Sequence, residues 1–110
     1  MQSSSPYGIA RQLENYMLRA LSGIDMAELA PRPRDIASSL KMQVIDLRLE
    51  ARDYEYAENR HDQQLHAKTA HAYADTVRQG VLAASESGVF SAVEVVEFST
   101  LLDNLIECLS

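Results

Sequence analysis

The chain has 110 residues, which is enough for one domain, because domains cluster at about 100 to 150 residues and a second core would be too small to be stable. Its 46% hydrophobic and 24% charged residues match soluble globular proteins and exclude a disordered or collagen-like chain. Ten basic and sixteen acidic residues give a net charge of -6, the wrong sign for neutralising nucleic-acid phosphates. We therefore expect one acidic domain over residues 1–110 that does not bind nucleic acid.

The sequence also predicts where the protein resides. Cys108 is the only cysteine, so no disulfide can form within the chain, which suits a reducing cytoplasm. The N-terminal residues lack the continuous apolar segment of a secretory signal. The longest apolar runs, such as residues 81–84, are far shorter than the roughly 20 residues that span a bilayer. We expect a cytoplasmic protein without membrane contact.

The N-terminal segment predicts a helix over residues 6–22. Ser5 is a favoured N-cap residue, and Pro6 suits the first helical position because its missing N–H would be unpaired there in any case. Apolar residues then recur at steps of three and four, which places them on one helix face. Residues 24–33 contain two prolines, which cannot continue the interior of a helix, so we expect a connector there.

The middle of the chain predicts a long helical region. Residues 34–79 contain neither glycine nor proline and are rich in strong helix formers. One unbroken helix would be about 70 Å long, twice the diameter of a compact domain of this size. The region therefore either divides into helices over 34–57 and 63–86 or stays continuous and pairs with a second copy. A break is expected in residues 57–64, which lack large apolar side chains.

Two apolar stripes run along the predicted helix 34–57. The first follows helical steps and predicts the core face: Ile36, Leu40, Val44, Leu47, Ala51 and Tyr54. The second follows helical steps along another side of the same helix: Met42, Ile45, Leu49 and Tyr56. Together they predict a wide buried face, more than one helical hairpin requires, which indicates a homodimer.

The C-terminal segment carries the clearest helix start in the chain. Ser91 and Glu94 have the spacing of a capping box, and Phe90 and Val95 occupy the flanking hydrophobic-staple positions, which predicts a helix over 91–109. The predicted elements give an all-α fold. We expect a three- to four-helix bundle, or an elongated helical hairpin with a long central helix, that is completed by homodimerisation with coiled-coil packing.

A polar cluster in the middle of the chain admits a metal-binding interpretation. Glu58 and His61 have the i, i+3 spacing by which helical bundles of the ferritin-like class present a carboxylate and an imidazole to iron or manganese. Carboxylates from other helices or from a second copy would have to complete such a site. The alternative is a solvated stretch whose charges form local pairs. The sequence by itself assigns no cofactor.

Residues 60–66 carry a second candidate motif, in which Arg60 is followed by a polar residue and then, six positions on, by His66. This segment resembles the motif of the HEPN ribonuclease family. The resemblance covers seven residues and implies metal-independent RNA cleavage between two facing chains. His66 would transfer the proton and Arg60 would stabilise phosphate charge. The tyrosine that often follows this motif is absent, and the negative net charge disfavours RNA binding.

The absence of a convincing catalytic set favours a small protein-binding module without catalysis of its own. An inhibitor or immunity protein, a secretion chaperone and a scaffold subunit are all consistent with such a module. Its expected partners are a second copy and another protein, which the net charge predicts to be basic. The predicted interaction surface is rich in aromatic and long apolar side chains: Met42, Leu49, Tyr54, Tyr56 and Tyr73.

Overall fold

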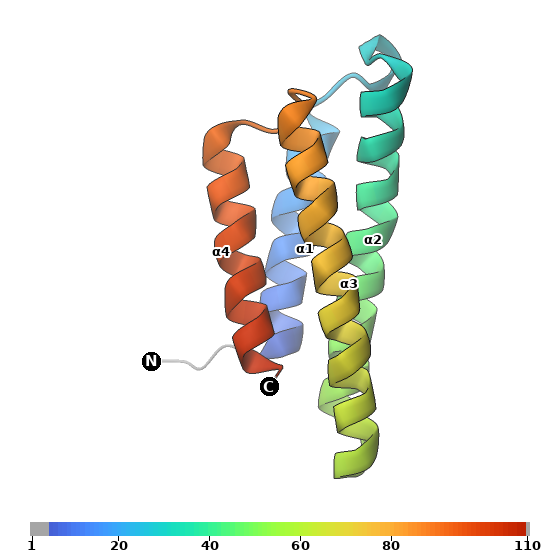
Figure 1. Cartoon of the computed structure of the whole chain (residues 1–110), viewed down its shortest axis with the longest axis vertical. Coiled ribbons are helices and arrows are strands. Elements are labelled where there is room, and N and C mark those ends of the chain that lie inside the picture. The colour runs from blue at the N-terminus through green and yellow to red at the C-terminus, as the bar shows by residue number, and fades with distance from the viewer. Residues whose placement is uncertain (1–4, 110) are drawn as a thin grey trace.

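The computed structural model describes residues 5–109, and these form an all-α structure, as predicted. The elements in chain order are α1 (Pro6–Ser22), a short 3-10 helix η1 (Met26–Glu28), α2 (Pro31–Tyr56), α3 (Arg60–Glu86) and α4 (Ala92–Cys108). Consecutive α-helices run in opposite directions and close a ring, because α1 packs against α2 and α4, and α3 packs against the same two helices (Figure 1). No helix among the described residues is both long enough and apolar enough to cross a membrane.

The first helix begins and ends where the sequence indicates. The Ser5 hydroxyl accepts a hydrogen bond from the Gly8 N–H at 2.9 Å, and Pro6 occupies the first helical position. The following connector is fixed by Arg34, whose guanidinium donates to the carbonyl oxygens of Met26 and Leu29. This bond set ties η1 to the first turn of α2.

The second helix begins at Pro31, three residues before the predicted start, and the connector is correspondingly shorter. Pro31 and Pro33 both lie in the first turn, where backbone N–H groups have no carbonyl partner within the helix. A missing N–H therefore costs no hydrogen bond at either position. The expectation that both prolines exclude a helix was wrong because it treated them as interior residues.

The long middle region divides into two helices. The chain turns at residues 57–59, inside the stretch that lacks large apolar side chains. Helix α3 begins at Arg60, before the expected residue 63, because the Asn59 side chain accepts a hydrogen bond from the Asp62 N–H at 2.8 Å. This N-cap starts the helix although the first turn contributes no large apolar residue to the core.

The predicted capping box of the last helix is confirmed. The Ser91 hydroxyl accepts from the Glu94 N–H, and the Glu94 carboxylate accepts from the Ser91 N–H. The turn before it contains Gly88, whose φ of 77° lies in the left-handed region that favours glycine. Phe90 packs edge-to-face on Phe98 with ring centroids 4.9 Å apart, which ties this turn to the core.

The first apolar stripe of α2 forms part of the core, as predicted. Leu40, Val44, Leu47 and Ala51 are fully buried, and Ile36 and Tyr54 at the two ends are partly buried against them. The facing side of α3 presents mainly small residues, with Ala70, Ala74, Val77, Val81 and Ala84 buried. These short side chains let the two longest helices approach closely.

The second apolar stripe, which we call the outer stripe (Met42, Ile45, Leu49 and Tyr56), lies outside the core. Met42 is 61% exposed and Tyr56 is 71% exposed, whereas Ile45 and Leu49 are partly buried. A single chain therefore buries only the first stripe, and burial of the outer stripe by a second copy stays a prediction. The core face of α2 is directed at α1, α3 and α4, and the outer stripe lies too far around the helix to reach it.

Candidate functional site

Unequal helix lengths create an exposed tip at one end of the molecule. Helices α2 and α3 have 26 and 27 residues, whereas α1 and α4 have 17 each. The difference corresponds to roughly 14 Å of helix. The α2–α3 hairpin therefore extends past the ends of α1 and α4 (Figure 1). At this hairpin tip, α1 and α4 no longer cover the inner faces of α2 and α3 (Figure 1).

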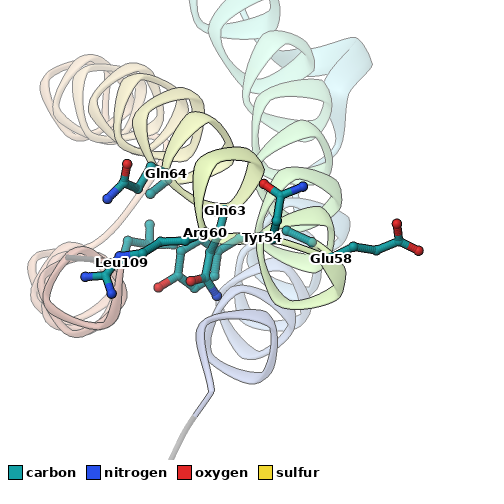
Figure 2. A pocket seen from close by; sticks show the side chains of 9 residues that line it. Tyr54, Glu58, Arg60, Gln63, Gln64 and Leu109 are labelled. Atoms are coloured by element: carbon teal, nitrogen blue, oxygen red, sulfur yellow. The ribbon is translucent and has the colours of Figure 1, made fainter.

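A cavity of about 470 Å³ lies against this inner face, between the hairpin tip and the end of α4 (Figure 2). Arg60 extends toward Leu109, whereas the carboxylate of Glu58 points away from the other lining side chains. Six of the nine residues that line the cavity carry a polar group in the side chain, and the nine are Tyr54, Ala57, Glu58, Asn59, Arg60, Gln63, Gln64, Ala67 and Leu109. The amide groups can exchange hydrogen bonds with a partner, and Arg60 can pair with an anion.

A histidine and two carboxylates meet on the contact between α2 and α3. His66 Nδ1 lies 2.5 Å from the Glu50 Oε2 atom, and Glu50 is largely buried. Asp53 stands one turn further along α2, and one ligand atom from each of the three residues lies within 4.8 Å of the others. This donor set suits a divalent cation such as zinc or manganese. The hydrogen-bonded ion pair accounts for the same geometry without a metal.

The ion pair changes the acidity of the histidine. The hydrogen bond that Glu50 accepts from His66 raises the pKa of the imidazole above its ordinary value of 6.5. The negative charges of Glu50, Asp53 and Asp62 raise this pKa as well. Partial desolvation opposes this shift. The raised pKa shifts His66 toward the charged imidazolium relative to a free histidine, whereas a metal ligand or a general base needs the neutral form.

The structure does not bring Arg60 and His66 together within one chain. Six residues turn a helix through about 600°, so the two side chains leave different sides of α3. Arg60 lines the cavity beside α4, whereas His66 is held by Glu50 on α2. A shared RNA-cleaving site built from these two residues would require a rearrangement or a second chain.

Glu58 and His61, the candidate metal pair, do not lie on one helix. Glu58 lies in the turn between α2 and α3, and His61 lies in the first turn of α3. The i, i+3 geometry requires one continuous helix, so the spacing that suggested a site has no structural counterpart. Both side chains are exposed. The carboxylates that do approach a histidine are those of Glu50 and Asp53.

The five residues of the predicted interaction surface occupy three places. Met42, Leu49 and Tyr56 share the outer stripe of α2. Tyr54 is partly buried against the core and lines the hairpin-tip cavity. Tyr73 lies on α3 and is 38% exposed. The largest continuous group is thus the outer stripe, extended by Ile45.

Sequence reasoning missed the Glu50, Asp53 and His66 cluster. The available signal was the i, i+3 spacing of two carboxylates on one helix, followed by a histidine after a turn. Recognising the cluster also requires the register of the α2–α3 hairpin, which depends on the turn at 57–59. Comparisons of the chain with protein-family models, curated proteins and solved structures gave no match.

Proposed function

We propose that the chain is a protein-binding module without catalysis of its own and that the outer stripe of α2 is its binding surface. The observation that carries this proposal is the exposure of Met42 and Tyr56, at 61% and 71%, on a helix whose other apolar stripe already fills the core. Methionine and tyrosine are enriched at protein interfaces relative to other surface. An apolar row at helical spacing outside a closed core is typical of a docking face.

The alternatives receive less support from the geometry. The ribonuclease interpretation needs Arg60 and His66 to meet between two facing chains, because within one chain they leave different sides of α3. The metal interpretation needs a neutral imidazole, whereas Glu50 favours the charged form of His66. A binding role requires neither condition.

The net charge bears on which partners suit the module. At a net charge of -6, most of the surface would attract a basic protein and accelerate its association. An inhibitor or immunity protein, a secretion chaperone and a scaffold subunit remain the roles consistent with such binding. We also propose a cytoplasmic location, since the single cysteine suits a reducing compartment.

Paired charge substitutions test this proposal. The variant Met42→Glu/Tyr56→Glu places two carboxylates on the outer stripe, and Val93→Glu/Val96→Glu places two on α4, where the native residues are similarly exposed at 68% and 65%. Both variants carry the same added charge, and circular dichroism should show that both fold. Tagged proteins are purified from the native host, and the associated chains are quantified by mass spectrometry.

We expect the outer-stripe variant to lose associated chains that the wild type and the α4 variant both retain. The reason is that a charged side chain in an apolar interface must be desolvated without a partner. Equal recovery by all three proteins, or loss from the α4 variant alone, would contradict the proposal.

A further inference from the structure

The outer stripe has the spacing of a two-stranded coiled coil. Met42, Leu49 and Tyr56 follow one another at intervals of seven residues, and Ile45 stands three residues after Met42. These are the a and d positions of a heptad repeat. Ser38 and Arg52 occupy the neighbouring d positions, so the continuous apolar contact is short and is centred on the segment from Met42 to Leu49.

Charges of opposite sign flank the stripe on its two sides. Lys41 and Arg48 occupy the heptad position before each a residue, on the side facing α1, where Arg48 forms an ion pair. Asp46 and Asp53 occupy the position after each d residue, on the side facing α3, where Asp53 joins the histidine cluster. These are the g and e positions, whose charges set the orientation of paired helices.

We propose that the outer stripe binds a second copy of this chain, with the two α2 helices side by side and parallel. In that arrangement Lys41 lies against Asp46 of the partner subunit, and Arg48 lies against Asp53 of the partner subunit, because g and e′ residues five positions apart meet in parallel coiled coils. An antiparallel pair would bring the basic g sides together and the acidic e sides together. The inference rests on the proposed function, since it names the partner of the same surface.

The charge balance of this face favours a second copy over a basic protein. The four flanking side chains sum to zero, within a chain whose net charge is -6. Two acidic copies therefore repel least where these faces meet. A basic partner would gain more from the acidic surface elsewhere on the molecule.

The flanking charges are available for contacts between copies. Among residues 5–109, neither Lys41 nor Asp46 forms an ion pair within the chain. Arg48 Nε lies 2.8 Å from a carboxylate oxygen of α1, and the guanidinium has further N–H donors that can reach a second carboxylate. The Asp53 carboxylate is about half exposed and lies 3.8 Å from Arg52 Nε.

A charge-reversal cycle tests the proposed pairing. Lys41→Glu and Asp46→Lys each turn two attractive contacts per dimer into repulsive ones, which should weaken dimerisation about tenfold. The double variant Lys41→Glu/Asp46→Lys restores both contacts with exchanged signs, so its dissociation constant should return to near that of the wild type. Residues five apart lie about 140° apart around one helix, so no contact within the chain can produce this rescue. Sedimentation equilibrium measures all four dissociation constants.

A disulfide test measures the orientation of the two helices. In a parallel pair, identical a positions face each other, so Met42→Cys in a Cys108→Ser background should form a covalent dimer on mild oxidation. In an antiparallel pair centred between Ile45 and Leu49, the two copies of residue 42 would be roughly 15 Å apart and could not be linked. Val93→Cys in the same background is the matched control and should form no covalent dimer.

The outcomes separate this inference from the proposed function. Dimerisation with rescue in the double variant and a Met42→Cys cross-link would support the inference. A monomeric wild type, or a dimer without rescue, would overturn it. If Met42→Glu/Tyr56→Glu then still lost an associated protein that the α4 variant retained, the outer stripe would remain a binding surface for a different partner. If the stripe variant lost nothing, the proposed function would fail as well.

Discussion

Gly80 on α3 offers a sharp test of the helix packing because α2 side chains lie directly against it. A Cβ atom at this position would stand 2.6 Å from Leu40 Cδ2 and 3.0 Å from Gln43 Oε1. Ordinary carbon–carbon contacts are about 3.5 to 4.0 Å, so Gly80→Ala is short of space by about 1 Å. Leu40 is fully buried, so its side chain must shift within the core to make room for the added methyl group.

Two opposing effects decide the size of the change. Alanine is better than glycine inside a helix by about 1 kcal/mol. Overpacking a well-packed contact costs about 1 to 3 kcal/mol. Gly80→Ala should therefore lower the free energy of unfolding by about 1 kcal/mol, the difference between these terms.

The sign should reverse when the obstructing side chain is removed. Leu40→Ala alone should cost about 2 to 5 kcal/mol because it leaves a cavity in the core. In that background the added methyl group of Gly80→Ala meets no Leu40 atom, and the helix-propensity gain of about 1 kcal/mol should appear as a net stabilisation. The effects of Gly80→Ala and Leu40→Ala on the free energy of unfolding are therefore not additive. Gly80→Ala should destabilise the wild type and stabilise the Leu40→Ala variant.

Urea unfolding followed by circular dichroism at one protein concentration measures these free energies. Gly23→Ala is the control, because its Cβ would lie 3.7 Å from the nearest atom, the Ala20 carbonyl oxygen, and its φ of -80° suits any residue. That variant should change the free energy of unfolding little. A stabilising Gly80→Ala in the wild-type background, or an equal loss in both backgrounds, would refute the packing argument.

Two further predictions concern the ion pairs. Because Glu50 raises the folded-state pKa of His66, their contact stabilises the fold fully below about pH 6.5 and loses its effect as the pH rises through the raised pKa. His66→Gln should remove this pH-dependent part of the free energy of unfolding, and identical pH profiles for variant and wild type would contradict the assignment. Arg48→Met leaves the buried Glu14 carboxylate without its cation and should cost about 2 kcal/mol. Adding Glu14→Leu should recover most of that loss in urea unfolding, and no recovery would indicate that Arg48 acts through packing alone.

The sequence predicts those parts of the fold that depend on short-range chemistry. The capping box at Ser91 and the N-cap at Ser5 give two helix starts, because each uses hydrogen bonds between residues three apart. The core stripe of α2 follows from helical spacing alone. The start of α2 at Pro31 was missed because a proline is excluded from a helix interior but not from its first turn.

The candidate site is harder to predict because it depends on how separate helices align. The cluster of Glu50, Asp53 and His66 exists only when α3 lies antiparallel to α2 in one register. The hairpin-tip cavity follows from a difference in helix lengths, which no local pattern encodes. Apolar spacing identified the outer stripe but did not reveal whether one chain buries it, since that depends on where the other helices pack.

The most direct test of the account is a dilution series of amide NMR spectra of the wild-type protein, from about 1 mM to about 10 μM, a range suited to a dissociation constant of about 100 μM. The account predicts concentration-dependent shifts concentrated on residues 41–56 of α2, with the exposed face of α4 around Val93 and Val96 unchanged. Spectra that do not change with concentration, or shifts that map to α4, would contradict the claim that the outer stripe binds a second copy.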